Sequence, residues 1–255
     1  MSNWLEKQRK DNQALTVERR LMNEALALLG QTGETRAAGA RSGRLIFVLD
    51  LTGSRENSLR DARIATAAMF DAIKTIGSVA VKLIYYRGAN ECRASQWHDD
   101  PGVLCQSMLA LSCKTGATQI ARVLRLALAE KEKVCGMVFV GDHCEDDPDE
   151  LVSLAQKLGQ QSMPLFVFHE CADHDERSLR AKPVFKRMAE LSGGVYVEFK
   201  PDSGIVLREM LSNVATLAAA GSEGVRRAVL PVSPEARQLR SHLLLLPVAT
   251  RKQLK

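Results

Sequence analysis

Short hydrophobic runs alternate with longer amphipathic segments between residues 45 and 219. The runs are rich in β-branched and aromatic residues, and unbroken apolar runs of this length are typical of buried parallel strands. The intervening segments repeat apolar residues every three or four positions, which is typical of amphipathic helices. Strands that alternate with helices predict a doubly wound α/β fold with a mostly parallel sheet of six strands.

Each predicted element has a definite place in the chain. Strands are expected at residues 45–49, 79–86, 91–97, 134–140, 165–168 and 194–199. Helices are expected at residues 56–76, 100–111, 119–131, 178–191 and 204–219, with another opened by the acidic residues 145–150. The second and third strands are separated only by a turn at 87–90, so we expect a hairpin and one antiparallel edge strand.

The two ends of the chain differ from this pattern. Residues 1–43 are expected to form an N-terminal helix and a linker, and residues 44–220 the α/β domain. Residues 221–255 form a basic C-terminal tail in this interpretation. The tail contains Pro231, Pro234 and Pro247 around an apolar run, so we expect it to be poorly ordered or docked on a partner.

The first strand runs directly into polar residues that suit a hard cation. Asp50, Thr52 and Ser54 carry oxygen on alternate positions, so their side chains can point to one side of the turn. Such groups are not stable in a protein interior without partners. This end of the strand is therefore expected to face solvent or a ligand.

The stretch Asp50-Leu51-Thr52-Gly53-Ser54 resembles the D-x-[ST]-x-S opening of the metal-ion-dependent adhesion site (MIDAS) of von Willebrand factor type A (vWA) domains. The resemblance implies a Rossmann-like sheet of order 3-2-1-4-5-6, in which the first and fourth strands are neighbours. Asp50 and Asp142 would then end adjacent strands, about 4.8 Å apart. Two carboxylates this close repel each other unless a cation or a proton lies between them.

The same resemblance implies the other ligands and a partner. The family places a threonine in a glycine-rich loop against the metal, and Gly116-Ala117-Thr118 matches that loop, with Thr115 as the reserve candidate. The implied ligands of an octahedral Mg²⁺ or Mn²⁺ are Asp50, Thr52, Ser54, Thr118 and Asp142. In the family an acidic side chain of a protein partner fills the open position, so the ion bridges two proteins and is not a catalyst. Intracellular members often act beside AAA+ ATPases or in multiprotein assemblies.

Two residues depart from the family pattern. Arg55 stands where the family often has methionine, and a cation there would weaken metal binding or attract an acidic partner. His143 follows Asp142 where the family usually has a small residue. Neither departure removes an implied ligand.

Three other kinds of site are weighed against this one. The same stretch resembles the D-x-T-G-T motif of haloacid-dehalogenase-like phosphatases, in which Asp50 would be the nucleophile, and Gly141-Asp142 begins a similar metal motif. Those enzymes usually have a second Asp at position 52 and a lysine, for which Lys131 and Lys133 are poorly placed. A zinc site and a Cys113 nucleophile are weaker alternatives; the zinc ligands would come from His143, Cys144, His169, Cys171 and His174.

The composition of the chain predicts a soluble cytoplasmic protein. The 255 residues are 45% hydrophobic and 25% charged, which is ordinary for a soluble globular protein. No membrane span or secretory signal is recognisable, and six cysteines without paired spacing indicate reduced thiols in the cytoplasm. Residues 45–221 hold 20 Lys and Arg against 23 Asp and Glu, so the net charge of +5 resides in the two ends. Basic patches interleaved with aromatics are missing, so nucleic acid is not an expected partner.

Overall fold

The computed structural model describes residues 43–56, 59–73, 79–172, 175–201 and 203–246. The N-terminal helix predicted within residues 1–43 lies outside the described residues. None of the described helices is both long enough and apolar enough to cross a membrane.

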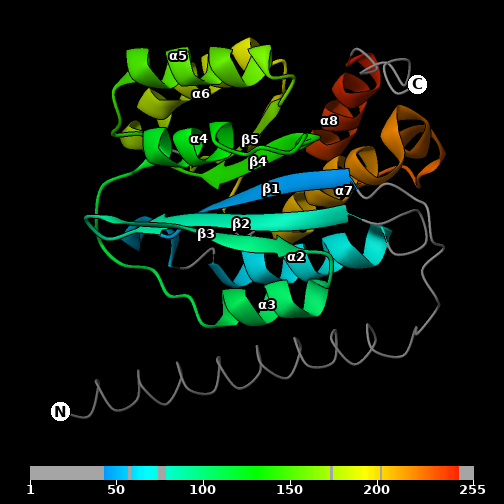
Figure 1. Cartoon of the computed structure of the whole chain (residues 1–255), viewed down its shortest axis with the longest axis horizontal. Coiled ribbons are helices and arrows are strands. Elements are labelled where there is room, and N and C mark those ends of the chain that lie inside the picture. The colour runs from blue at the N-terminus through cyan, green and yellow to red at the C-terminus, as the bar shows by residue number, and fades with distance from the viewer. Residues whose placement is uncertain (1–42, 57–58, 74–78, 173–174, 202, 247–255) are drawn as a thin grey trace.

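One six-stranded sheet forms the centre of the molecule, with the order β3-β2-β1-β4-β5-β6 (Figure 1). Every neighbouring pair is parallel except β2 with β3, which is the predicted antiparallel hairpin. The predicted α/β fold class and its edge strand are thereby confirmed. The strands are β1 (Gly43–Asp50), β2 (Val79–Arg87), β3 (Glu91–His98), β4 (Gly136–Gly141), β5 (Leu165–Glu170) and β6 (Tyr196–Phe199).

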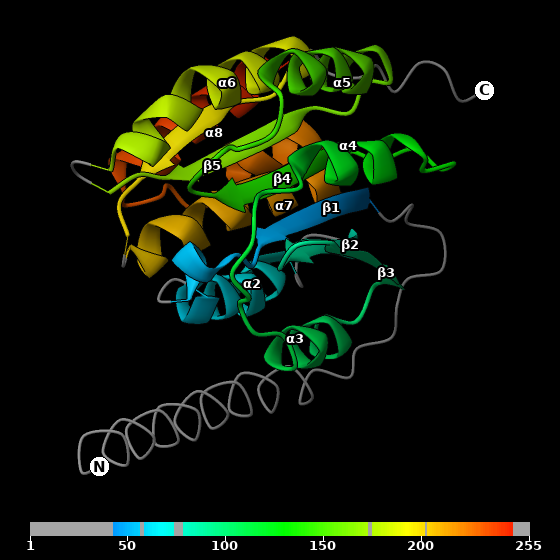
Figure 2. The ribbon, with the colours of Figure 1, turned by 90° about the vertical axis from the view of Figure 1, so that its left-hand side faces the viewer.

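Helices cover both faces of this sheet. Figure 2 shows them on either side of strands β3, β2, β1, β4 and β5. One face is covered by α2 (Leu59–Ile73), α3 (Pro101–Leu109), α7 (Gly204–Arg227) and α8 (Pro234–Leu245). The other face is covered by α4 (Ile120–Leu128), α5 (Pro148–Gln160) and α6 (Glu176–Ser192). A single 3₁₀ turn, η1 (Gly53–Arg55), lies between β1 and α2.

The alternation of side chains along β1 explains why the strand is hydrophobic without interruption. Leu45, Phe47 and Leu49 pack with the α2 side, whereas Ile46 and Val48 pack with the α4 side. All five are fully or almost fully buried. Burying a side chain of this size contributes about 2 kcal/mol, so both faces of β1 favour its central place in the sheet.

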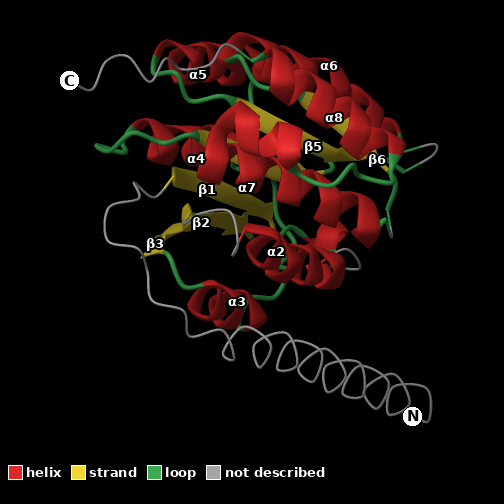
Figure 3. Ribbon diagram, turned by 90° about the vertical axis from the view of Figure 1, so that its right-hand side faces the viewer, coloured by secondary structure: helices red, strands yellow, loops and turns green. Residues whose placement is uncertain are grey.

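The segment after residue 219 differs from the expectation of a poorly ordered or partner-docked tail. Helix α7 continues to Arg227 past a break at Gly221, whose φ of 67° is readily adopted only by glycine. Helix α8 then packs on the sheet face that α7 covers (Figure 3), and its residues Ala236, Leu239 and Leu243 are fully buried. The expectation is wrong for this helix, because Pro234 occupies the first helical turn, where proline is favoured.

Candidate metal centre

The predicted site lies where β1 and β4 end side by side. Leu49 pairs with Val140 in the parallel register, so Asp50 and Asp142 leave neighbouring strands at the same end of the sheet. Both carboxylates are buried, with 2% and 8% of the residue exposed. Burial and the charge of Asp142 together raise the pKa of Asp50 to about 6. Asp142 is therefore close enough to Asp50 for its charge to disfavour the ionised form of Asp50.

The turn after β1 brings the first three predicted ligands together. The Oδ1 atom of Asp50 accepts a hydrogen bond of 2.8 Å from the backbone N–H of Thr52. The hydroxyl oxygens of Thr52 and Ser54 are 3.2 Å apart. Neighbouring ligands of an octahedral ion with metal–oxygen distances of about 2.1 Å lie about 3 Å apart, so these two hydroxyls have the spacing of adjacent ligands.

Unsatisfied polar atoms concentrate in this site. Among the described residues, seven buried side-chain nitrogen and oxygen atoms lack a hydrogen bond of ordinary geometry, and five of them belong to Asp50, Arg55, Tyr86 and Asp142. Two of the five still face a partner, because Nη1 of Arg55 lies against Glu170 and the hydroxyl of Tyr86 lies against Asp50. The others include Oδ2 of Asp50 and Oδ1 of Asp142. Buried polar atoms in folded proteins almost always have partners, so such a concentration calls for an explanation. A divalent cation fits the pair of orphaned carboxylate oxygens.

A small cavity opens beside the turn that follows β1, and its lining residues do not include Asp50 or Asp142. It has a volume of about 220 Å³, and its walls bring together the β1 turn, the loop before α4, the loop after β4 and the first turn of α6. The lining residues are Thr52, Gly53, Ser54, Thr115, Gly116, Thr118, His143, Glu145 and Arg177. Three of the five predicted ligands thus line the cavity, and the reserve candidate Thr115 lines it as well.

Thr118 is held on the cavity wall by Glu145 and Asp146, which the sequence pattern places only at the start of the next helix. Its hydroxyl donates to Oδ2 of Asp146 at 2.7 Å and accepts from the backbone N–H of Glu145 at 2.8 Å. Asp146 also accepts from the first N–H groups of α4, those of Ile120 and Ala121. It therefore caps a helix from another loop, a relation that no local spacing in the sequence indicates. One lone pair of the Thr118 hydroxyl is left for a further ligand.

Backbone bonds fix the loop that presents Thr118. The N–H of Lys114 donates to the carbonyl of Leu51 at 3.0 Å, and the carbonyl of Lys114 accepts from Gly88 at 3.1 Å. A side chain at Gly116 would place its Cβ 2.2 Å from the carbonyl oxygen of Gly88. Glycine is therefore required where the loop passes over the β2–β3 turn.

The two residues that depart from the family pattern both lie at the site. His143 is buried, and its Nε2 lies 2.7 Å from Oδ2 of Asp175, the residue that caps α6. Although partial burial acts in the opposite direction, the hydrogen bond from His143 lowers the pKa of Asp175. Arg55 is 2% exposed, and its Nη1 lies 2.5 Å from Oε2 of Glu170 at the end of β5. The sequence pattern did not indicate Glu170 as a member of the site.

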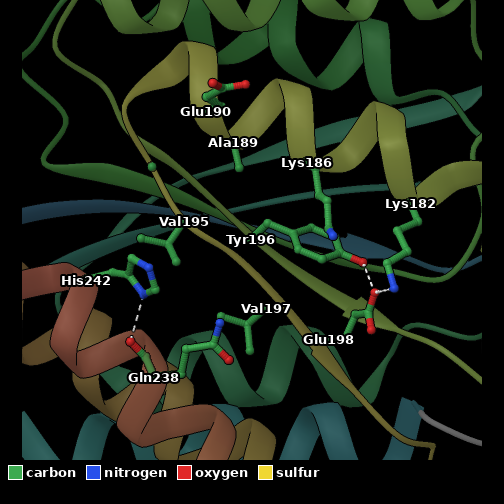
Figure 4. A pocket seen from close by; sticks show the side chains of 11 residues that line it. Lys182, Lys186, Ala189, Glu190, Val195, Tyr196, Val197, Glu198, Gln238 and His242 are labelled. Atoms are coloured by element: carbon green, nitrogen blue, oxygen red, sulfur yellow. Dashed lines mark hydrogen bonds and ion pairs between the residues drawn. The ribbon is translucent and has the colours of Figure 1, made fainter.

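A buried hydrogen-bond chain supports Asp142 from below. The Nε2 atom of His169 donates to the carbonyl of Asp142 at 3.0 Å, and its Nδ1 lies 2.7 Å from the hydroxyl of Tyr196. Figure 4 shows the continuation of the chain from Tyr196 to Glu198 and Lys182, in the wall of a second cavity between α6, β6 and α8. His169 is thus a positioning residue of the β4 end.

The alternative sites receive less support from the described residues. No group of three or more His, Cys, Asp or Glu within them is arranged to hold a metal, and His174 lies outside them. Burial and Glu56 raise the pKa of Cys113 to about 12, which keeps this thiol protonated. Lys131 and Lys133 precede β4, at the opposite end of the sheet from Asp142, and are exposed. No lysine lines the cavity beside the turn that follows β1.

Comparisons with known proteins bear on the fold. The sequence matches no protein-family model and no curated protein. Among solved structures, it is similar to a von Willebrand factor type A protein from Catenulispora acidiphila (TM-score 0.53, 15% identity, covering 69% of this chain and 43% of that one). It is also similar to the SpRpn10 VWA domain (TM-score 0.50, 15% identity, 69% and 95%). A third is the vWF domain of the type V pili tip protein Mfa5 from Porphyromonas gingivalis (TM-score 0.50, 13% identity, 70% and 95%).

These similarities differ in how much of each protein they cover. The chain spans less than half of the Catenulispora protein and 62% of another match, the PilB minor pilin from Streptococcus sanguinis. It spans 95% of the two isolated domains. The similarity is therefore that of one shared domain.

Proposed function

We propose, from the premise that this chain has the fold of the von Willebrand factor type A domains, that it is a metal-dependent protein-binding module. Asp50, Thr52, Ser54, Thr118 and Asp142 would hold one Mg²⁺ or Mn²⁺, some of them through water. The ion would leave one position open toward the cavity, where an acidic side chain of a protein partner completes the coordination. In this proposal the ion bridges two proteins, and the chain is not an enzyme.

The observation that supports this proposal most strongly is the pair of unpaired carboxylate oxygens on Asp50 and Asp142. Two buried acids that repel each other lower stability unless another group compensates their charge. The hydroxyls of Thr52 and Ser54 lie beside them at the spacing of adjacent ligands. Oxygen ligands of this kind favour Mg²⁺ or Mn²⁺ over softer metals.

The phosphatase alternative lacks a supporting observation of this kind. A nucleophilic Asp50 would need a general acid near position 52, but that residue is a threonine. The two lysines proposed for that chemistry lie at the far end of β4. Turnover of p-nitrophenyl phosphate that disappears in Asp50→Asn would nevertheless overturn the binding proposal.

The cytoplasmic setting and the AAA+ ATPase or assembly partner are also proposals. Cys92, Cys113, Cys135, Cys144 and Cys171 are free thiols, which agrees with a reducing compartment. The partner class rests on the family resemblance, and two of the similar structures are those of a minor pilin and of a pilus tip protein. The acidic side chain of the partner rests on the same family resemblance.

Asp142→Ala tests the proposal directly. We expect calorimetric titration with MgCl₂ or MnCl₂ to show binding to the wild-type chain and none to the variant, while circular dichroism shows the same fold. Asp149→Ala is the matched control, because Asp149 is an exposed acid on α5. Affinity purification with and without a chelator then tests the partner. Capture that persists in excess chelator would contradict the bridging role.

A further inference from the structure

Arg55 places a permanent positive charge inside the candidate metal centre. Arg55 is 2% exposed and is the last residue of η1. Its backbone N–H donates a hydrogen bond to the carbonyl of Thr52 at 3.0 Å. The same short turn thus holds both the hydroxyl of Thr52 and the guanidinium of Arg55. Because the side chain is buried and paired with Glu170, the guanidinium is held beside the ligand turn.

Acids from three neighbouring strands face this guanidinium. Glu170 of β5 forms the ion pair, and Asp142 and Asp50 are the next charges in order of influence. Burial alone would lower the pKa of Arg55, but these three carboxylates raise it. With all acids ionised, three negative charges surround one positive charge, so the buried group retains a charge equivalent to two carboxylates. One divalent cation compensates that remainder.

Stability alone does not account for the pair of Arg55 and Glu170. A buried ion pair of this kind is often no more stabilising than well-packed apolar residues of the same volume. The Nε atom of Arg55 also makes no hydrogen bond within the described residues, so the ion pair leaves part of the buried guanidinium without a hydrogen-bond partner. Its charge also reaches the two carboxylates of the centre, because Asp50 and Asp142 face the same guanidinium as Glu170.

We infer that Arg55, anchored by Glu170, is a positioning residue that weakens the binding of divalent cations and holds the two carboxylates in place before a cation binds. This inference rests on the proposed function, because it concerns the same ion. The guanidinium attracts the carboxylates of Asp50 and Asp142, and it repels the cation that they would share. The centre therefore binds Mg²⁺ weakly and follows changes in its concentration.

Two variants with opposite expected effects test the inference. The double variant Arg55→Met/Glu170→Met removes the pair without leaving a lone buried charge, and we expect it to bind Mg²⁺ and Mn²⁺ about tenfold more tightly. Glu170→Gln leaves Arg55 without its anchor charge, so we expect binding about tenfold weaker than in the wild type. Both are measured by calorimetric titration with the chloride salts, without any partner protein. A purely structural role would not change affinity in opposite directions.

The pair of Lys82 and Glu130 provides a matched control. These side chains are 2.5 Å apart and largely buried, but they connect the middle of β2 with the end of α4, away from the cavity. Lys82→Met/Glu130→Met is expected to leave the Mg²⁺ affinity unchanged. Arg55→Lys keeps the charge, so it is expected to keep the weak affinity of the wild type.

The outcomes separate this inference from the proposed function. Equal Mg²⁺ affinity in the wild type, in Arg55→Met/Glu170→Met and in Glu170→Gln would overturn the inference and leave the proposed function standing. Binding by the double variant alone would support the inference and contradict the proposed function of the wild-type chain. Absence of binding in both would overturn both. If the double variant fails to fold by circular dichroism, the comparison of Glu170→Gln with the wild type decides.

Discussion

Two clusters of polar groups around carboxylates differ in whether the chain itself supplies hydrogen bonds to the carboxylate oxygens. At the junction of α7 and α8, Glu209 accepts hydrogen bonds from the N–H groups of Val232 and Ser233 and from the Ser233 hydroxyl, at 2.6 to 2.9 Å. At the ends of β1 and β4, Asp50 and Asp142 each retain an oxygen without a hydrogen bond. The first carboxylate is satisfied within the chain, whereas the second pair is not.

The two clusters shift pKa values in opposite directions. Partial burial would raise the pKa of Glu209, but the donors at Ser233 and Val232 lower it. Burial and Asp142 raise the pKa of Asp50 to about 6. A polar cluster that stabilises the fold favours its charged form, while one kept for a ligand leaves charge uncompensated until the ligand binds. The difference separates an acid that is satisfied within the chain from a pair of acids that is not.

The largest effect is expected on the structural side of this comparison, at the helix that Glu209 joins to the domain. Leu239 of α8 is fully buried in the core. We expect Leu239→Ala to lower the free energy of unfolding by about 3 kcal/mol, as for other large-to-small core substitutions. Urea denaturation measures the change. Leu230→Ala is the control, because Leu230 is 71% exposed; an equally small effect of Leu239→Ala would show that α8 does not belong to the core.

Asp50→Asn is expected to have the opposite sign. The amide keeps the acceptor for the N–H of Thr52 and removes a buried charge beside Asp142, so we expect a gain of roughly 2 kcal/mol at pH 7 in the presence of a chelator. Thermal or urea unfolding measures it. The same variant should lose any stabilisation by Mg²⁺. A loss of stability in chelator would mean that the charge of Asp50 is already compensated within the chain.

Glu209→Ala should destabilise the chain by about 1 to 2 kcal/mol, because it leaves the N–H groups of Val232 and Ser233 without their charged acceptor. The estimate is modest because this junction is partly exposed to water. Urea denaturation checks it, with Glu223→Ala, an exposed acid on α7, as the control. Mg²⁺ affinity should not change, since Glu209 takes no part in the candidate metal centre. A change in Mg²⁺ affinity would show that Glu209 is coupled to the candidate metal centre.

The pH dependence of stability provides the smallest and most specific test. Glu209 has a lowered pKa in the folded state, so its contribution is complete above pH 4.5 and is lost as the pH falls through the folded pKa. Asp50 has a raised pKa, so its penalty is complete above pH 6 and disappears as the pH falls toward 3.8. Unfolding curves from pH 7 to pH 4 should therefore show the gain from Asp50→Asn shrinking first, while the loss from Glu209→Gln persists to about pH 4.5. The reverse order would contradict both assignments.

Local pattern was sufficient to predict most of the fold. Uninterrupted apolar runs predicted the central strands, because a strand buried on both faces has no polar positions, as Ile46 and Phe47 of β1 illustrate. The edge strand β3 was predicted instead from its alternating pattern after the turn at 87–90. Helix α8 was missed because three prolines were interpreted as breaks. The Ser233-Pro234 pair is in fact a helix start, with the serine hydroxyl as cap and the proline in the first turn.

The candidate site was predictable only where motif and strand order combine. The resemblance placed Asp50 and Asp142 on neighbouring strands, and the structure brings them together. Glu170 and Asp146 were not predictable, because their roles depend on tertiary contacts with Arg55 and Thr118 that leave no spacing in the sequence. The assignment of Asp50 and Asp142 to a metal is a proposal that the titrations above test.

The backbone bonds that join the loop around Lys114 to Leu51 and Gly88 have a consequence for the rate of association. A loop that is already held by its neighbours loses little conformational entropy when another molecule docks on it. Association with the proposed partner would then require no slow rearrangement of the loop. Variants of the contact surface should differ mainly in the dissociation rate of the complex. The conformational entropy of this loop is therefore lost when the chain folds, not when another molecule binds.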